Sequence, residues 1–337
     1  MPALRIPLSL TVVAAALALA ACATRVDAPA SQASVDAHVA QARQLAGGDL
    51  QMLMPLCQPQ PATRPDPTVT NNRLAQAIAA PPPEPGQVFD NLYFVGSAWV
   101  TAWVLKTSDG LILIDALNNA LEARGLIDGG MARLGLDPRQ IKYVIVTHGH
   151  GDHYGGANYI RERYGARVVA SEDDWRMMET ALEFSSPHWG APPKRDISVK
   201  DGDRLTLGDT TMTFYVTPGH TVGTLSPVFD VKTGGRSHKA LLWGGTSFNF
   251  GKDFGRLESY AAATERMRRM TAQLPVDVLL SNHAGWDGTL QKMAALRASG
   301  GRGPHPFVTG PQVVDRGLHL MGECARAQRD RFRMAGA

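Results

Sequence analysis

Three histidines and one aspartate lie within six residues of one another and have the types and spacing of metal ligands. They are His148, His150, Asp152 and His153, separated in part by glycines and placed directly after the apolar run of residues 143–146. Strand ends are where a rigid scaffold presents reactive side chains, and glycines allow the sharp turns that let alternate side chains converge. Imidazole together with carboxylate favours Zn²⁺ over Ca²⁺ or Mg²⁺, which prefer oxygen ligands. A loop of capping or surface histidines is the alternative, but this clustering, in a chain with ten histidines, favours a metal site.

Two further histidines follow apolar runs elsewhere in the chain. His220 comes after residues 213–216 in a Thr-Pro-Gly-His-Thr turn, and His283 comes after residues 278–280 in a Ser-Asn-His-Ala-Gly turn. Either histidine alone would more often be structural. Because a metal site must be completed by ligands from distant segments, we expect both to join the first four. Zinc held with an open coordination position lowers the pKa of bound water to about 7 and can supply a hydroxide nucleophile.

The elements that must position these residues fall into two strand-rich blocks with helices after them. Apolar and β-branched runs predict strands at residues 92–95, 98–105, 111–114, 143–146 and 167–170, and again at residues 204–207, 211–216, 225–231, 240–243 and 276–280. Helical patterns cover residues 120–134, 155–164, 172–182, 257–274, 289–297 and 312–333. Two such blocks predict an α+β fold in which two sheets pack together with helices outside.

The His-x-His-x-Asp-His motif, followed by Pro-Gly-His-Thr and by a histidine after a later strand, resembles the metallo-β-lactamase superfamily. The resemblance covers about residues 88–297 and implies a four-layer αββα sandwich with two zinc ions per chain. It also implies two ligand sets, which are His148, His150 and His220 for one zinc and Asp152, His153 and His283 for the other.

Three further positions relate the chain to particular branches of that superfamily. Asp115 matches a family aspartate that supports the metal loop through hydrogen bonds, and a turn-forming carboxylate is the alternative for it. Gly245 stands where many members have a zinc-bridging aspartate, and Thr246 stands where the commonest β-lactamases have a zinc-binding cysteine. The combination resembles subclass 3 of the class B (zinc) β-lactamases, in which Thr246 would hydrogen-bond a zinc-bound water.

The resemblance implies that the chain opens β-lactam rings with a metal-bound hydroxide oriented by Asp152, and so has a role in antibiotic resistance. Phe248 replaces a serine that this subclass often uses on the substrate carboxylate, so we expect Ser247 or Asn249 to substitute for it. Another hydrolase of the same fold, acting on a lactone, ester or phosphoester, is the alternative. A second alternative is a metal-binding protein without catalysis, but two sets of three ligands each would leave coordination positions open for water. The aromatic and proline-rich residues 188–193 form either a pocket wall or a surface loop, and we favour the loop.

The first residues predict export. Arg5 is followed by the almost wholly apolar residues 8–21, which are too short to span a bilayer permanently and are typical of a signal peptide, here residues 1–21. The Leu-Ala-Ala-Cys sequence that ends at Cys22 resembles the bacterial lipobox. It implies a periplasmic lipoprotein anchored to the outer membrane through Cys22, with ordinary signal cleavage nearby as the alternative.

Residues 22–86 are predicted to be an N-terminal arm and residues 87–337 the metallo-β-lactamase domain. Residues 35–57 have helical periodicity, broken at a pair of glycines, and the many prolines between residues 59 and 85 predict an extended tether. A disulfide between Cys57 and Cys324 and a pair of free buried thiols both stay open.

The charge balance of 34 Lys and Arg against 31 Asp and Glu gives +3 without a basic run, which excludes nucleic-acid binding on composition. We expect a small-molecule substrate as the partner and membrane contact only through a lipid anchor. The oligomeric state stays open.

Overall fold

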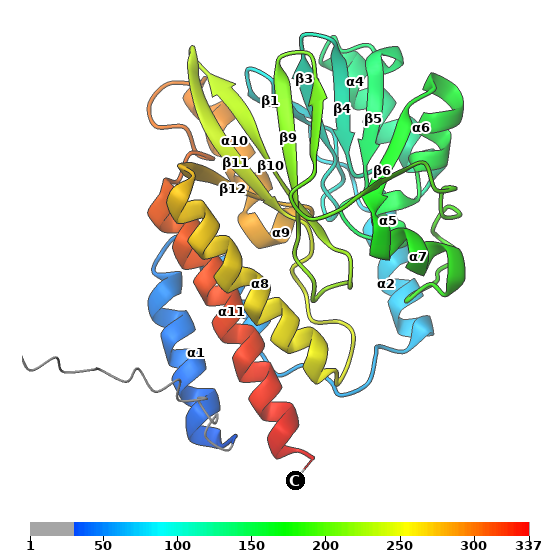
Figure 1. Cartoon of the computed structure of the whole chain (residues 1–337). Helices are drawn as coiled ribbons and strands as arrows, with labels where there is room; N and C mark the ends of the chain where they lie inside the picture. Colours follow the sequence, from blue (N-terminus) through cyan, green and yellow to red (C-terminus); the bar gives the residue numbers. More distant parts are fainter. Residues whose placement is uncertain (1–29, 337) are drawn as a thin grey trace, which may run out of the picture.

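Two β-sheets packed face to face form the centre of the computed structural model, which describes residues 30–336 (Figure 1). The first sheet has seven strands in sequential order, namely β1 (Gly86–Phe89), β2 (Leu92–Phe94), β3 (Trp103–Thr107), β4 (Gly110–Ile114), β5 (Ile141–Ile145), β6 (Arg167–Ser171) and β7 (Ile197–Val199). Strands β1 to β4 are antiparallel and β4 to β7 are parallel. The second sheet has the order β12-β11-β10-β9-β8, with β8 (Arg204–Leu207), β9 (Thr210–Val216), β10 (Leu225–Thr233), β11 (Arg236–Trp243) and β12 (Val276–Ser281). Within it β11 and β12 are parallel, and the other pairs are antiparallel.

Large apolar side chains from both sheets fill the space between them. Trp103 and Ile112 of the first sheet and Phe214 and Phe229 of the second belong to this buried cluster. Burying one such side chain contributes about 1.5–3 kcal/mol. Strand β4 is apolar and buried at four of its five positions, as expected of a strand covered on both faces.

Helices cover the outer face of each sheet. The outer face of the first sheet packs on α3 (Ala120–Glu122), the π-helical η2 (Ala123–Asp128), α4 (Gly129–Arg133), α5 (Gly151–Tyr154), α6 (Ala157–Tyr164) and α7 (Glu172–Thr180). The outer face of the second sheet packs on α8 (Phe254–Gln273) and α11 (Pro311–Met334), and α1 (Gln32–Ala46) packs on α11, so that the three helices lie side by side in Figure 1. Short helices α9 (Ala284–Asp287) and α10 (Thr289–Ser299) follow β12, and η3 (Pro138–Gln140) precedes β5. The order helix, sheet, sheet, helix confirms the predicted four-layer α+β fold.

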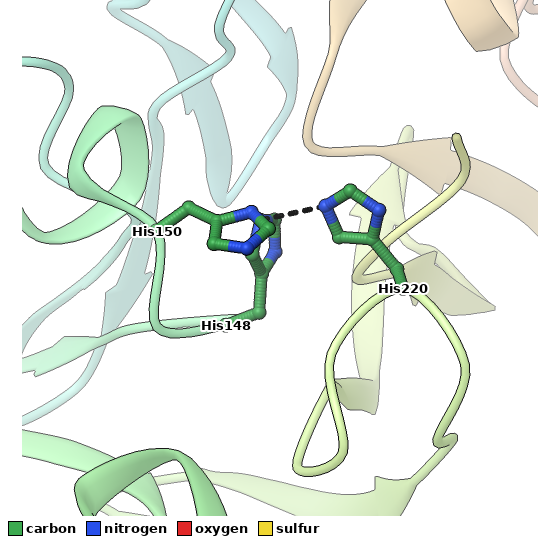
Figure 2. A group of neighbouring side chains, drawn as sticks. All are labelled: His148, His150 and His220. Carbon is green, nitrogen blue, oxygen red and sulfur yellow. Dashed lines mark hydrogen bonds between the residues drawn. The ribbon is translucent and has the colours of Figure 1, made fainter. Parts of the chain in front are cut away.

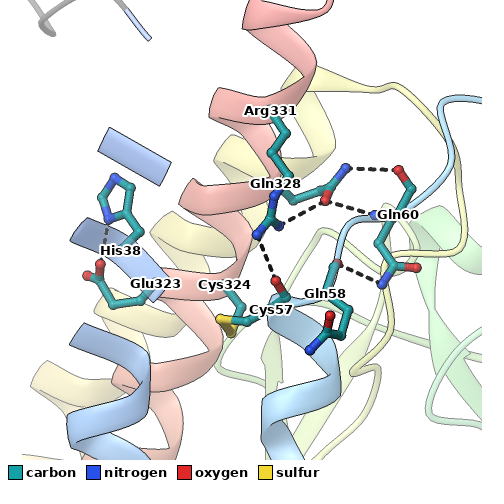
Figure 3. Close-up of a disulfide and its surroundings, with 8 residues drawn as sticks. All are labelled: His38, Cys57, Gln58, Gln60, Glu323, Cys324, Gln328 and Arg331. Carbon is teal, nitrogen blue, oxygen red and sulfur yellow. Dashed lines mark hydrogen bonds and ion pairs between the residues drawn. A yellow bond between two sulfur atoms is a disulfide. The ribbon is translucent and has the colours of Figure 1, made fainter. Parts of the chain in front are cut away.

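The segment before β1 is packed structure from its first helix onward. Helix α1 buries one face against α11 and ends at Gly47, which has a positive φ of 49°. The 3₁₀ helix η1 (Gln51–Cys57) adds Leu53 and Leu56 to the same cluster. A disulfide joins Cys57 to Cys324 in α11 (Figure 3). The helical periodicity of residues 35–57 is therefore confirmed by α1 and η1.

Helix α2 (Pro67–Ala79) lies within the proline-rich region that we expected to be extended. Its first turn is capped by the Asp66 carboxylate, which accepts hydrogen bonds from the backbone N–H groups of Thr68 (2.7 Å) and Val69 (3.3 Å). Pro67 stands at the first helical position, where its missing N–H costs nothing. The prolines of this segment therefore flank a helix.

The predicted signal peptide, residues 1–21, and the lipidation site Cys22 lie outside the described residues. Among residues 30–336, none of the helices has the length and apolar character needed to cross a membrane.

Candidate metal centre

Six side chains from three separate turns converge at one end of the two sheets. The turn of residues 147–150 follows β5 and leads into α5, the second turn follows β9, and the third follows β12. The first of two clusters, the three-histidine cluster, consists of His148, His150 and His220. Each offers a ligand atom within 4.8 Å of the others, and Nε2 of His220 lies 3.1 Å from Nε2 of His148 (Figure 2). All three of these histidines, His148, His150 and His220, are buried.

The second cluster lies beside the first. Nε2 of His153 is 3.2 Å from Nε2 of His283 and 3.3 Å from Oδ2 of Asp152. The same carboxylate oxygen is 3.6 Å from Nε2 of His283. The ring centroids of His148 and His153 are 4.0 Å apart, so the two clusters share a boundary. The structure thus brings together all six side chains that the sequence singled out as ligands.

In two of the rings the outer nitrogen contacts a backbone carbonyl. Nδ1 of His148 is 2.7 Å from the carbonyl oxygen of Gly244, and Nδ1 of His220 is 2.8 Å from that of Ser247. A ring whose Nδ1 donates to a carbonyl carries its lone pair on Nε2, which is the atom that points into the cluster. The protein backbone therefore sets the tautomer that metal binding needs.

Asp115 supports the first turn as predicted from the family resemblance. Its carboxylate accepts hydrogen bonds from the backbone N–H and the hydroxyl of Thr147, both at 2.8 Å, and lies 2.7 Å from Nδ1 of His153. Asp115 has φ 61°, a left-handed conformation that few residues other than glycine adopt. Such strain is typical of a functional site.

A second supporting carboxylate, Asp174, was not singled out from the sequence. It accepts hydrogen bonds from the N–H groups of Gly149 (2.8 Å) and Gly223 (3.0 Å) and from the hydroxyl of Thr221 (2.9 Å), so it joins the first turn to the second. Burial raises the pKa of Asp174 to about 6, although the hydrogen bond from Thr221 acts in the opposite direction. One acidic residue among three at the start of α7 carries no distinguishing signal in the sequence.

Electrostatics shift the pKa values of His148, His283 and His153 in different directions. Burial and the neighbouring imidazoles lower the pKa of His148 well below its ordinary value, and burial lowers the pKa of His283 to about 4. The carboxylates of Asp152 and Asp115 outweigh burial and raise the pKa of His153 to about 10. A bound cation would replace the proton between Nε2 of His153 and Asp152, while Nδ1 would keep its proton toward Asp115, since ligating imidazoles must be neutral.

A pocket of about 390 Å³ opens over the clusters. Its wall is largely aromatic, with Trp99, Phe184, Trp189 and Trp286, and helix α2 contributes further lining residues. The indole N–H of Trp189 donates to Oδ1 of Asn118 at 2.9 Å. The expectation that residues 188–193 form a surface loop is therefore wrong, because the wall is made by their tryptophan. No local pattern could predict this contact, since the bond spans 71 positions.

The other predicted site residues have different positions. Ser247 and Asn249 line the pocket, and Oδ1 of Asn249 is buried without a hydrogen-bond partner among residues 30–336. Thr246 is only 2% exposed and does not line the pocket; its backbone carbonyl accepts a hydrogen bond from the hydroxyl of Tyr260 at 3.0 Å. Phe248 is also buried, and its ring packs on Tyr260 with centroids 4.9 Å apart. Phe248 therefore belongs to the core and leaves its neighbours to face the pocket.

Gly245 is packed against a candidate ligand. A Cβ at this position would lie 2.6 Å from Cβ and 2.8 Å from Cδ2 of His220. The position therefore has no room for any side chain unless His220 moves.

Comparisons with known proteins agree with this geometry. The family model of the metallo-beta-lactamase superfamily matches residues 100–283. Among solved structures, BJP-1, a subclass B3 metallo-beta-lactamase of Bradyrhizobium japonicum, is similar with a TM-score of 0.60 and 32% identity, covering 71% of this chain and 91% of that chain. The class B3 di-zinc metallo-beta-lactamase LRA-12 from an Alaskan soil metagenome gives 0.58 and 26% identity, covering 70% and 90%. A hydroxyacylglutathione hydrolase of Rhodopseudomonas palustris (strain BisA53) is 34% identical over 108 residues, 32% of this chain and 34% of its own length. The chain thus matches about a third of the length of such curated relatives.

Proposed function

The chain belongs to the metallo-β-lactamase superfamily and is a hydrolase of that fold, and from this premise we propose that it binds two zinc ions and opens the β-lactam ring. The observation that carries the proposal is the convergence of six donor side chains, four of which (His150, Asp152, His220 and His283) line one pocket with aromatic walls. Its neighbours of known structure include subclass B3 enzymes, one of them described as di-zinc.

The donor atoms fit zinc in both kind and spacing. Tetrahedral zinc with bonds of about 2.0–2.1 Å to nitrogen separates its ligand atoms by roughly 3.3 Å. The pairs His148–His220, His153–His283 and Asp152–His153 have donor separations of 3.1, 3.2 and 3.3 Å. Three donors in each set leave a further coordination position, as catalytic zinc sites do.

The chain's own groups have defined tasks in this proposal. Bound zinc would lower the pKa of water to about 7 and polarise the substrate carbonyl. Oδ2 of Asp152 faces the histidines, which leaves Oδ1 to orient the attacking water and take its proton. Ser247 and Asn249 offer polar groups from the pocket wall. Arg73 of α2 is the one cationic Lys or Arg side chain among the described residues that line the pocket, so we assign to it the substrate carboxylate.

A second candidate is ester or thioester hydrolysis on the same site, including the lactone and phosphoester alternatives. The similarity to hydroxyacylglutathione hydrolases over 108 residues favours it. The packing at Gly245 weighs against it, since the family's bridging aspartate would stand there and a Cβ would meet His220 at 2.6 Å. We therefore favour the lactam.

The test is a substrate panel with purified protein. It includes a chromogenic cephalosporin, a penicillin, a carbapenem, a homoserine lactone and S-lactoylglutathione. We expect cephalosporin turnover that dialysis against a strong chelator abolishes and added zinc restores, and His148→Ala should lose it. Turnover of the lactone or thioester alone would favour the second candidate, and lactam turnover without metal would refute the mechanism.

We also propose that the protein is exported and anchored through Cys22. The disulfide between Cys57 and Cys324 supports this, because such bonds persist in oxidising compartments. Mass spectrometry of the N-terminal peptide after expression in bacteria should find an acylated Cys22 in the membrane fraction, and a periplasmic chain without lipid would indicate ordinary cleavage. A resistance role predicts a higher minimal inhibitory concentration of the lactams that the enzyme turns over.

A further inference from the structure

Besides Asp115 and Asp174, a third supporting carboxylate, Glu183, lies against a candidate ligand, and the sequence did not indicate it. Glu183 follows α7, and its side chain is only 6% exposed. Its Oε2 lies 3.2 Å from Nε2 of His150. An ionised carboxylate can only accept hydrogen bonds, so this contact keeps a proton on Nε2.

That contact decides which atom of His150 is available to a metal ion. With Nε2 protonated, the lone pair of the ring is on Nδ1. The other two histidines of the cluster have the opposite arrangement, since Nδ1 of each contacts a backbone carbonyl. No carbonyl of this kind from residues 30–336 contacts His150, which depends on Glu183 for its tautomer.

Two arginines hold Glu183 in place. Its Oε1 accepts a hydrogen bond from Nη2 of Arg64 at 3.1 Å and another from Nη1 of Arg256. Nε of Arg256 donates to the carbonyl oxygen of Gly219 at 2.8 Å, and Gly219 precedes His220 in the chain. Arg256 also lies over the ring of Phe250 at 4.1 Å and is itself largely buried. The Glu183–Arg256 pair thus links the turn that carries His150 to the turn that carries His220.

We propose that Glu183 is a positioning residue for the three-histidine cluster, acting together with Arg256. It fixes His150 in the tautomer that presents Nδ1, and through Arg256 it holds His150 and His220 at the separation that one ion requires. Outer contacts of this kind typically change metal affinity by about 10- to 100-fold when removed. The inference rests on the proposed function only in that the cluster binds zinc, whatever the substrate.

The test compares Glu183→Gln with Glu179→Gln in the full chain. Glu179 is the matched control, because it lies on α7 close to Glu183 but pairs with Arg195 at the surface. Zinc affinity is measured by competition with a chromogenic chelator, and the tautomer of His150 by long-range ¹⁵N–¹H NMR of the histidine rings. We expect wild-type and Glu179→Gln protein to show Nε2–H at His150. In Glu183→Gln, zinc binding to one of the two sites should weaken by about 10- to 100-fold and the tautomers of His150 should mix.

A second pair of variants keeps the test decisive if Glu183→Gln unfolds. Arg256→Lys retains the positive charge but not the fork that reaches both Glu183 and Gly219, so we expect intermediate zinc affinity and an unchanged His150 tautomer. Glu183→Asp shortens the reach to His150 and should also weaken zinc binding. Wild-type zinc affinity with an unchanged His150 tautomer in folded Glu183→Gln would overturn the inference. Failure of every lactam in the substrate panel would refute the proposed function and leave this result standing.

Discussion

Replacing Gly245 by alanine should damage the metal centre through one methyl group. The added Cβ would lie 2.6 Å from Cβ of His220, where ordinary contacts begin at 3.4 Å, so something must retreat by at least 0.8 Å. The tolerance of a zinc–nitrogen bond is about 0.2 Å. Overpacking of this kind costs about 1–3 kcal/mol. If the cost falls on the bound state, zinc affinity at the three-histidine cluster drops by about 5- to 150-fold, since 1.4 kcal/mol is a factor of ten.

The measurement is a zinc titration against a chromogenic chelator, with Gly125→Ala as the control. A Cβ at Gly125 meets nothing within 4 Å, and its φ is not positive. We expect the control to bind zinc like the wild type and Gly245→Ala to lose affinity at one site. Gly245→Asp should be worse, although it restores the bridging carboxylate of other family members. Full zinc loading and unchanged affinity in either Gly245 variant would refute the steric argument and reopen the ester and thioester alternatives.

Four further predictions concern other parts of the molecule. Removing the disulfide with Cys57→Ala and Cys324→Ala opens a loop with a sequence separation of 267. By loop-closure entropy it should cost about 5.6 kcal/mol and lower the Tm by about 8 °C, and added reductant should then change nothing. Asp115→Asn cannot accept all three of its hydrogen bonds, so zinc affinity should fall by about 10-fold or more; an unchanged chelator titration would contradict this. Arg73→Ala should raise KM for a carboxylate-bearing lactam by about 2- to 5-fold with little change in kcat, and should not affect its methyl ester. Glu323 is buried, but its hydrogen bond with His38 (Figure 3) and the charge of Arg326 lower its pKa. Folded protein therefore binds fewer protons than unfolded protein below the ordinary value of 4.5, so stability decreases as the pH falls through that window, and Glu323→Gln should flatten the acid side of a plot of Tm against pH.

The ligands could be predicted from the sequence because each stands at a local landmark. The first four lie in one turn after an apolar strand, and His220 and His283 follow strands β9 and β12. In a two-sheet sandwich those strand ends meet at one edge, so an apolar run followed by small residues and a histidine carries most of the information. The disulfide was different, since Cys57 and Cys324 are 267 positions apart and their pairing depends on α1, η1 and α11 packing together.

Strand β3 shows where a local pattern failed. Residues 98–102 have the apolar and β-branched character of a strand, yet β3 begins only at Trp103. The preceding residues leave the sheet to meet the third turn, where Val100 forms a bridge with His283 and the N–H of Thr101 donates to the carbonyl of Asn282 at 2.9 Å. This detour places Trp99 in the pocket wall, with its ring 5.1 Å from that of His283. A tertiary contact at the site thus outweighed the local preference for strand.

The metal ligands of the pocket were easier to predict from the sequence than its walls. The ligands depend on residue types that chemistry restricts, since few side chains besides histidine and carboxylate bind a cation of this kind. The aromatic part of the walls depends on shape: Trp189 lies against Gly151, where a Cβ would come within 2.3 Å of its ring. Helix α2 contributes Leu74 and Arg73 from a segment whose prolines predicted no structure. Apolar surface can be supplied by many residues in many places, so the sequence constrains it weakly. Substrate preference should therefore depend on those long-range contacts, and variants of the walls should change KM before they change metal binding.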